Sequence, residues 1–228
     1  MPLAIITGAS RGLGLALARA LAERDWSLVI DARRADHLAR AANELSAKTE
    51  VAAVVGDVSD DWHRHALLEA AGDEVDLLVN NASVLGPSPQ PELARYPLRE
   101  LERVYRANVF APLALAQLVL PRLPDGGAIV NITSDAAREP YPGWGGYGSS
   151  KAALEQLSAI LAGEHPAIRV YAVDPGDMRT QMHQEAFPDE DISDRPPPED
   201  SVPGLLELIE GRLPSGRYEA RELPARAV

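Results

Sequence analysis

Short apolar runs alternate with longer segments of helical spacing along the chain. Continuous apolar runs are typical of strands that a sheet buries on both faces. They predict strands at 3–7, 26–30, 51–55, 76–80, 127–132 and 168–173. Apolar residues at helical spacing predict a helix after the first strand and further helices near 35–46, 60–71, 97–120 and 148–163. Strand–helix alternation predicts an α/β fold, a doubly wound, mostly parallel sheet with helices on both faces.

The whole chain, residues 1–228, is predicted to form a single domain, because it contains no internal repeat and no dividing linker. One segment, 177–200, differs in composition from the rest. Its "FPDEDISDRPPPED" stretch has six acidic residues, one arginine and four prolines. With so little to bury, the segment is expected to be a mobile loop over the substrate. A last helix is predicted at 199–210, followed by a short tail.

Composition narrows the class of protein. The apolar share of 46% supports a sizeable core, and the charge balance of 22 − 34 = −12 argues against nucleic acid or an anionic membrane as a partner. With no cysteine, disulfides and thiolate metal sites are excluded. The five histidines are scattered, and the "HRH" at 63–65 is interpreted as a solvated helix face, so no metal site is expected. No leader or long apolar run is evident, which favours a cytoplasmic protein.

A glycine-rich turn connects the first strand to the first helix. In "TGASRGLG" the glycines Gly8, Gly12 and Gly14 have the spacing G-x-x-x-G-x-G. Small residues let the backbone approach a pyrophosphate, and the helix N-terminus offers unpaired N–H groups. Glycines alone can mark an ordinary tight turn, but the flanking strand and helix favour phosphate binding. The spacing differs from the commoner G-x-G-x-x-G pattern.

A second set of polar residues lies in "NITSDAAREPYPGWGGYGSSK". Ser134 follows a predicted strand, and Tyr147 and Lys151 are four positions apart, on one face of a predicted helix. A nearby ammonium would lower the pKa of a tyrosine and bring the phenol towards useful acid–base range. Ser134 could hydrogen-bond a carbonyl oxygen. Each residue also has an ordinary structural interpretation. Tyr147 and Lys151 could be a pair packed on the surface of a helix, and Ser134 could be a cap or part of a turn.

Six motifs in order resemble those of the short-chain dehydrogenase/reductase family. They are "TGASRGLG", "GDVSD", "LVNNAS", "YRANVFAP", "NITS" with "YGSSK", and "VDPGDMRT", and they span nearly the whole chain. The resemblance implies a Rossmann-type sheet of about seven strands. It implies Ser134, Tyr147, Lys151 and Asn108 as catalytic residues. It implies as cofactor-binding residues Gly8, Ser10, Arg11, Gly12, Leu13, Gly14, Arg33, Asp57, Val58, Asn81, Ala82, Tyr147, Lys151, Pro175, Gly176 and Thr180.

The resemblance also implies a mechanism. Hydride transfer would interconvert an alcohol with a ketone or aldehyde, with Tyr147 exchanging the proton. Lys151 would lower the pKa of Tyr147 and bind the nicotinamide ribose, Ser134 would orient the substrate oxygen, and Asn108 would hold a water linked to Lys151. Two alternatives remain, a catalytically silent dinucleotide-binding regulator or scaffold, and an isomerase, epimerase or dehydratase that uses a bound nicotinamide.

Two features depart from the family pattern. Ser83 stands where the family usually has glycine, in "NNAS", and we expect a small local adjustment there. The chain is also shorter at its C-terminus than many members. By resemblance, the helices at 97–120 and 148–163 would form the faces of a homodimer or homotetramer.

The substrate is predicted from residues that would flank the nicotinamide. They are Tyr141, Trp144, Met178, Met182 and Phe187. They favour a small apolar or aromatic carbonyl compound, although some could simply pack the loops. The acidic segment would disfavour anionic substrates such as acyl-carrier-protein thioesters.

The cofactor type depends on "LVIDARRADHL", residues 28–38. An acid about 20 residues past the glycine turn is a mark of NAD, and Asp31 follows Gly14 by 17 residues. The resemblance, however, places Ala32 at the discriminating position and turns Asp31 away, as a partner of Arg34 or a cap of the turn. Arg33 and Arg11 would then pair with a 2′-phosphate. The sequence therefore favours NADP(H), with NAD(H) as the alternative.

Overall fold

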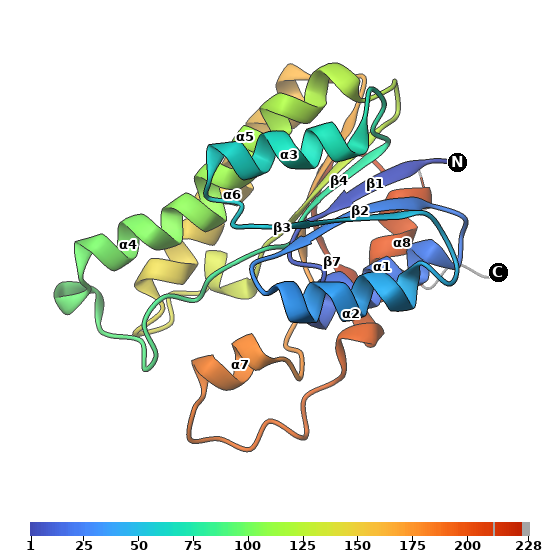
Figure 1. The fold of residues 1–228 in the computed structure, drawn as a ribbon. Coiled ribbons are helices and arrows are strands. Elements are labelled where there is room, and N and C mark those ends of the chain that lie inside the picture. The colour runs from blue at the N-terminus through green and yellow to red at the C-terminus, as the bar shows by residue number, and fades with distance from the viewer. Residues whose placement is uncertain (212, 225–228) are drawn as a thin grey trace.

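A seven-stranded parallel sheet forms the centre of the computed structural model, which describes residues 1–211 and 213–224 (Figure 1). The strands are β1 (Leu3–Ile6), β2 (Ser27–Ala32), β3 (Val51–Val55), β4 (Leu77–Asn80), β5 (Ala128–Ile132), β6 (Arg169–Asp174) and β7 (Gly216–Glu219). Their order is β3-β2-β1-β4-β5-β6-β7, and every neighbouring pair is parallel. The predicted doubly wound α/β class is confirmed.

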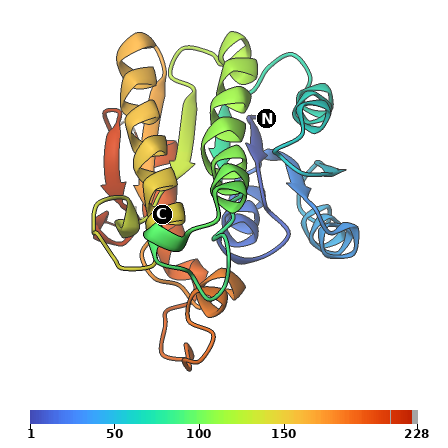
Figure 2. The ribbon, with the colours of Figure 1, turned by 90° about the vertical axis from the view of Figure 1, so that its left-hand side faces the viewer.

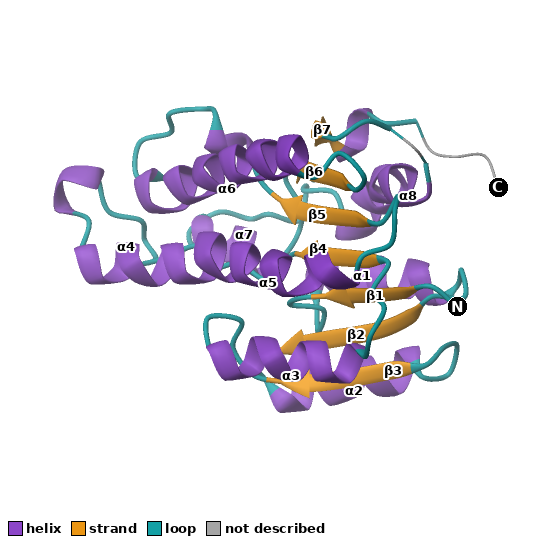
Figure 3. Cartoon of the chain, turned by 90° about the horizontal axis from the view of Figure 1, so that it is seen from above, coloured by secondary structure: helices purple, strands orange, loops and turns teal. Residues whose placement is uncertain are grey.

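Helices cover both faces of this sheet (Figures 1 and 3). The helices are α1 (Gly12–Ala22), α2 (Ala35–Leu45), α3 (Asp61–Ala71), α4 (Leu98–Tyr105), α5 (Ala111–Val119), α6 (Gly145–Glu164), α7 (Gln181–Ala186) and α8 (Val202–Glu210). On one face α1, α2 and α8 pack together, and on the other α3, α5 and α6 lie side by side (Figures 2 and 3). The short α7, within the segment predicted to be a loop, lies apart from both layers (Figure 1).

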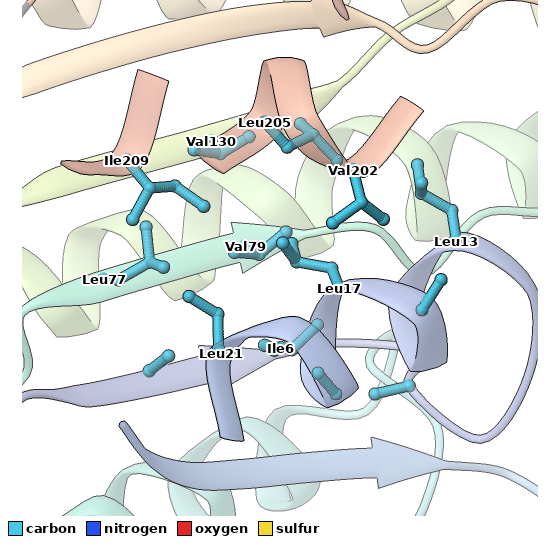
Figure 4. Packing of buried hydrophobic residues seen from close by; sticks show 14 of the residues in the cluster. Ile6, Leu13, Leu17, Leu21, Leu77, Val79, Val130, Val202, Leu205 and Ile209 are labelled. Atoms are coloured by element: carbon cyan, nitrogen blue, oxygen red, sulfur yellow. The ribbon is translucent and has the colours of Figure 1, made fainter. Parts of the chain in front are cut away.

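Strand alternation divides the apolar residues between two cores. On β1, Ile6 faces the α1 and α8 side, and its neighbour Ile5 faces the α3 and α5 side. In this core Leu17 of α1 lies beside Val79 of β4, and Leu205 of α8 lies beside Val130 of β5 (Figure 4). Because both faces of the central strands are covered, their sequences consist of uninterrupted apolar runs, which is why they could be identified.

The predicted strands and the observed strands agree except at the C-terminal edge. β7 has the sequence GRYE and is only partly buried, so it carries no apolar run that could reveal it. Its place comes from pairing with β6, in which Tyr171 lies opposite Gly216. A helical turn at Pro198–Ser201 and α8 correspond to the predicted last helix at 199–210.

The segment predicted as one helix at 97–120 is interrupted in its middle. A π-helical segment, Arg106–Phe110, separates α4 from α5 and contains the buried Asn108. Pro112 has no N–H to donate to the carbonyl four residues earlier, at Asn108, so the regular α-helical ladder cannot continue through this point.

One stretch among the described residues, Leu98–Arg122, is long and apolar enough to cross a membrane by length and composition. Half of its most apolar window is buried inside the fold. Leu115 and Val119 belong to the core between α5 and the sheet. A core helix passes the same test, so the expectation that no segment spans a membrane stays a prediction.

The packing between α1 and α8 predicts the effect of one core truncation. Leu17 is 1% exposed and Leu98 is 78% exposed. We expect Leu17→Ala to lower the free energy of unfolding by roughly 2–5 kcal/mol, because it removes buried methyl groups and leaves a cavity. Urea denaturation measures this, with Leu98→Ala as the matched surface control. Equal midpoints of urea denaturation for the two variants would contradict the burial of Leu17 in the core.

Candidate functional site

A cleft of about 510 Å³ opens at the carboxyl ends of the parallel strands. Ligands of doubly wound sheets bind in this region, near the point where the strand order reverses, here between β1 and β4. Of the residues predicted for catalysis and cofactor binding, the cleft is lined by Gly8, Ser10, Arg11, Gly12, Leu13, Arg33, Asp57, Val58, Asn81, Ala82, Ser134, Tyr147, Lys151, Pro175, Gly176 and Thr180. The two remaining predicted residues, Gly14 and Asn108, are not among the residues that line it.

The glycine turn leaves room for a ligand because its glycines have no side chains to fill the space. Gly8 has φ +67°, a conformation that favours glycine. A Cβ on Gly14 would lie 2.8 Å from the carbonyl oxygen of Gly8, so a side chain there would displace the turn. Helix α1 begins at Gly12, and among the described residues no side chain caps it at Arg11. Its first N–H groups therefore remain available to an anion such as a pyrophosphate.

The turn is anchored to the loop after β4 by polar groups. The hydroxyl of Thr7 accepts hydrogen bonds from the N–H groups of Asn81 and Ala82, both at 3.0 Å. The Asn81 side-chain amide donates to the carbonyl oxygens of Thr7 at 2.8 Å and Gly8 at 3.2 Å. Asn81 therefore acts on the cleft by holding the turn in place, a role that the motif did not reveal, and Thr7 was not among the predicted site residues.

Asp31 anchors the turn from the other side. Its carboxylate accepts the Gly8 N–H at 2.6 Å through Oδ1 and meets His63 Nε2 at 2.8 Å through Oδ2. Asp31 is 2% exposed, and burial raises the pKa of its carboxyl, while the hydrogen bonds from His63 and Gly8 lower it. Of the two roles suggested for Asp31, the cap of the turn is confirmed. The partnership with Arg34 is wrong, because Arg34 pairs with Asp36 at 3.1 Å.

The interpretation of "HRH" as a solvated face is wrong for its first histidine. His63 is 1% exposed, whereas His65 lies at the surface. A Cβ on Gly56 would lie 2.2 Å from His63 Nδ1, so the imidazole fits beneath Gly56 only because that residue is glycine. The buried partner of His63 is Asp31, which is distant in sequence, so helical periodicity alone could not predict it.

Basic side chains gather at the cleft end near β2. Arg11, Arg33, Arg34 and His37 all line it. Arg33 Nη1 lies 3.9 Å from Asp57 Oδ2, and the Arg33 side chain is 55% exposed. Such exposed guanidinium groups can make paired hydrogen bonds to a phosphate dianion. His37 and Arg34 were not among the predicted site residues, and their position is decided by the start of α2.

The predicted acid–base residues meet at the other end of the cleft. Ser134 follows β5, and Tyr147 and Lys151 lie one turn apart in the first part of α6. Lys151 Nζ donates to the carbonyl oxygen of Ile132 at 2.8 Å and lies 5.4 Å from the centre of the Tyr147 ring. Tyr147 is 8% exposed and Lys151 2%, which makes this a pair of buried titratable groups.

Burial controls the ionisation of this pair. It raises the pKa of the Tyr147 phenol, and Asp174 and Asp135 raise it further, while hydrogen bonding with Ser83 and Ser134 lowers it. Burial also lowers the pKa of Lys151 to about 7. The attraction of an ammonium for a phenolate predicted a lowered pKa for this tyrosine. In this structure desolvation outweighs that attraction.

Asn108 holds its surroundings together instead of facing the cleft. Its Oδ1 accepts from Ser83 Oγ at 3.1 Å and Val84 N at 2.9 Å. Its Nδ2 donates to the Val84 carbonyl at 2.9 Å and Ser150 Oγ at 3.0 Å. All four hydrogen-bonding positions of the amide are therefore in use.

An acid that sequence reasoning missed adjoins Ser134. Ser134 Oγ donates to Asp135 Oδ1 at 2.8 Å and accepts from Ala136 N at 3.2 Å. Asp135 Oδ2 accepts from the Tyr141 hydroxyl at 2.9 Å. The carboxylate therefore orients the serine hydroxyl and, by its charge, favours the protonated form of Tyr147. Asp135 belongs to no motif, so its chemistry is visible only in the structure.

Aromatic and other apolar side chains pack around Tyr147. The Trp144 ring lies 5.9 Å from the Tyr147 ring, 6.2 Å from that of Tyr141 and 5.8 Å from that of Phe187, measured between centroids. Of the five side chains predicted to flank the substrate, Trp144, Met178 and Met182 line the cleft. Tyr141 and Phe187 instead support Trp144 from behind.

The buried lysine predicts a pH dependence of stability. A lysine that titrates near 7 when folded and near 10.5 when unfolded binds fewer protons in the folded state between those values. The free energy of unfolding should then rise with pH across that window. We expect wild type to gain on the order of 3 kcal/mol relative to Lys151→Met between about pH 7 and pH 10. Urea denaturation across this range measures the difference.

The surface variant Lys48→Met is the control for this measurement, because Lys48 is half exposed and pairs with Glu23. Its stability should follow the wild-type pH dependence. If the free energy of unfolding changed with pH in the same way for wild type and Lys151→Met, Lys151 would not be the buried titrating group.

Comparison with known proteins agrees with this geometry. Residues 2–191 match the family model for short chain dehydrogenases. A benzil reductase of Saccharomyces cerevisiae that forms (S)-benzoin is 34% identical over 89% of this chain and 79% of its own length. A solved structure from Pseudomonas syringae, described as a short chain dehydrogenase, superposes with a TM-score of 0.89 at 30% identity, covering 96% of this chain and 94% of the other.

A second solved structure links the fold to a cofactor. An alcohol dehydrogenase from the archaeon Thermococcus sibiricus, complexed with 5-hydroxy-NADP, has a TM-score of 0.85 at 29% identity, over 98% of this chain and 99% of its own. The family match covers most of the chain, including the glycine turn and the Ser134, Tyr147 and Lys151 set. The chain belongs to the short chain dehydrogenase family of oxidoreductases, which act on CH–OH and carbonyl groups.

Proposed function

We propose that this protein is an NADP(H)-dependent oxidoreductase that interconverts a ketone or aldehyde with an alcohol. The observation that carries the proposal is one cleft that joins a bare glycine turn to Ser134, Tyr147 and Lys151. The turn and the start of α1 fit a pyrophosphate, and the buried phenol and amine fit proton exchange at a carbonyl oxygen. The cofactor would supply the hydride, and the residues of this chain manage the proton.

The ionisation of Tyr147 suits proton donation. Burial keeps the phenol protonated at neutral pH, so it can give its proton to the alkoxide that forms when a carbonyl is reduced. Ser134, whose hydroxyl donates to Asp135 in this structure, would turn its proton towards the same oxygen and orient it by hydrogen bonding. Lys151 would bind the nicotinamide ribose hydroxyls and restore the proton to Tyr147. Asn108 maintains the first turn of α6 through Ser150.

The preference for NADP(H) rests on the charges around the adenosine end. Arg11, Arg33 and Arg34 line this end, and Asp31 is buried against Gly8 and His63. A carboxylate with both oxygens occupied inside the protein is unsuited to the ribose 2′-hydroxyl that marks NAD enzymes. Asp57 and Val58 would adjoin the adenine, and Pro175, Gly176 and Thr180 would adjoin the nicotinamide. The complex of the Thermococcus sibiricus relative with 5-hydroxy-NADP supports this choice.

The substrate that suits the cleft is a small apolar or aromatic carbonyl compound. Trp144, Met182 and Leu85 surround Tyr147 on the substrate side and offer ring and thioether surface. The name of the yeast relative, a benzil reductase, supports aryl ketones as first candidates. The segment 177–200, with α7, would cover this side of the cleft as a substrate loop.

The alternative function is a regulator or scaffold that binds the dinucleotide without turnover. The buried Tyr147 and Lys151 weigh against it, because burying two titratable groups is costly and a binding module needs neither. Turnover separates the two functions directly.

We also propose that the protein is a cytoplasmic homo-oligomer of single-domain chains. The outer surfaces of α6 and of the adjacent π-helical segment expose Ile160 and Phe110. Exposed apolar side chains on adjacent helices suit a subunit contact.

Replacing the proposed acid tests the chemistry. We expect Tyr147→Phe to lower kcat for carbonyl reduction by about 10²–10⁴-fold, because it removes the proton donor. NADPH oxidation followed by absorbance over a panel of aryl ketones measures this. Tyr218→Phe is the matched control, since Tyr218 lies on β7 and donates to Pro214. Undiminished turnover by Tyr147→Phe would reject the assignment.

Replacing the basic residues tests cofactor preference. We expect Arg11→Ala combined with Arg33→Ala to raise the KM for NADPH at least tenfold, with little change in the KM for NADH. Each lost charged hydrogen bond to a phosphate is worth about 1.5–3 kcal/mol. Arg40→Ala is the control, because Arg40 is exposed on α2 and pairs with Asp36. An unchanged ratio of the two KM values would contradict the proposed 2′-phosphate site.

A further inference from the structure

His63 of α3 is a buried polar side chain that the proposed mechanism does not use. It is 1% exposed, and it is not among the residues that line the cleft. A polar side chain buried so completely generally makes hydrogen bonds that fix its neighbours. Any effect of His63 on a bound cofactor must therefore pass through the residues that it contacts.

The two ring nitrogens of His63 have different surroundings. Nε2 lies 2.8 Å from Asp31 Oδ2. Nδ1 lies against Gly56 and has no hydrogen-bond partner among the described residues. A proton on Nδ1 would be a buried donor without an acceptor, which is costly. The ring therefore carries its proton on Nε2 and donates it to the Asp31 carboxylate.

Asp31 transmits this contact to the glycine turn. Its Oδ1 accepts the Gly8 N–H at 2.6 Å, and its carbonyl oxygen accepts the Ala9 N–H at 3.0 Å. Burial raises the pKa of the Asp31 carboxyl, and the hydrogen bond from His63 lowers it. An ionised carboxylate is a stronger hydrogen-bond acceptor than a neutral carboxyl. His63 thereby strengthens the hydrogen bond that holds Gly8.

We propose that His63 is a positioning residue for the dinucleotide and that it acts through Asp31 and Gly8. Gly8 has φ +67° and lines the cleft, in the turn that leads to the start of α1 at Gly12. A turn held in this conformation presents the first N–H groups of α1 to a pyrophosphate with little left to order on binding. Without His63, the Asp31 carboxyl becomes neutral or turns towards water, and Gly8 loses its charged acceptor. This inference rests on the dinucleotide site of the proposed function.

The first experiment compares the two cofactors. NADPH and NADH share the pyrophosphate, so the loss of His63 should weaken both by the same factor. We expect His63→Leu to raise the Kd for each about tenfold, the scale of one lost hydrogen bond to a charged group, and to leave kcat at saturating cofactor near the wild-type value. Titration calorimetry measures the Kd without turnover. An unchanged Kd, or an effect on NADPH alone, would overturn the proposal.

Two amide variants separate positioning from a purely structural role. The side chain of glutamine is long enough to place an N–H donor near the position of His63 Nε2, whereas that of asparagine is too short. We expect His63→Gln to bind NADPH nearly as well as wild type and His63→Asn to bind it as weakly as His63→Leu. Both amide variants bury a polar group at the same place, so urea denaturation should show similar losses of stability. Equal Kd values for the two amide variants would indicate a purely structural role and overturn the proposal. If His63→Leu does not fold, this pair decides the question.

His65→Leu is the matched control. His65 lies two positions further along the same helix, its side chain is 60% exposed, and its Nδ1 contacts the carbonyl oxygen of Asp61. Its Kd values for both cofactors should coincide with those of wild type. If His65→Leu raised them as far as His63→Leu, the effect would not be specific to His63 and the proposal would be wrong.

The last experiment needs no cofactor. Hydrogen exchange of the Gly8 N–H, followed by NMR, should be about tenfold faster in His63→Leu and His63→Asn than in wild type and His63→Gln, because its acceptor is weakened. The ¹⁵N signals of the His63 ring in wild type should show a proton on Nε2 and none on Nδ1. Equal exchange rates, or a proton on Nδ1, would overturn the role of His63. If wild type binds neither NADPH nor NADH, the proposed function fails, and the exchange rates still decide whether His63 holds the turn.

Discussion

The structure depends on buried hydrogen bonds that fix the first glycine turn. A turn that is bare enough to admit a pyrophosphate has no side chains of its own to hold it. Asp31 supplies an acceptor for the Gly8 N–H from β2, and Thr7 accepts from the backbone at Asn81 after β4. A buried carboxylate is costly unless it is paired, and His63 provides that partner from α3. The turn is thus fixed by three neighbouring elements and still presents its N–H groups to the cleft.

Burial governs the chemistry at the other end of the cleft. It makes the Tyr147 phenol a weaker acid and the Lys151 amine a weaker base, which favours a protonated phenol beside an amine that can gain or lose a proton near neutral pH. The carboxylates of Asp174 and Asp135 also raise the pKa of Tyr147. A residue of β7 pairs with one of these carboxylates. Arg217 of β7 pairs with Asp174 at 2.9 Å and also with Glu155 of α6 at 2.9 Å. The edge strand therefore contributes to the electrostatics of the site.

Much of the fold and of the site followed from local patterns. Six strands and the principal helices could be predicted because both faces of the central strands are covered, which produces continuous apolar runs. The motif residues meet at one cleft because the carboxyl ends of parallel strands share an edge. β7 could not be predicted, since its residues are only partly buried and its place depends on pairing with β6. The roles of His63 and Asp135 likewise depend on partners brought near by folding.

The sequence by itself determined the α/β class, the family, the helical spacing that puts Tyr147 and Lys151 on one face, and the basic residues near β2. These properties depend on residues close together in the chain, or on motifs in a set order. The tertiary structure alone decided that Asp31 turns inwards to Gly8 and His63, and that burial sets the pKa values of Tyr147 and Lys151. Desolvation and the pairing of residues distant in sequence depend on which helices and strands pack together, and local sequence patterns do not predict that packing.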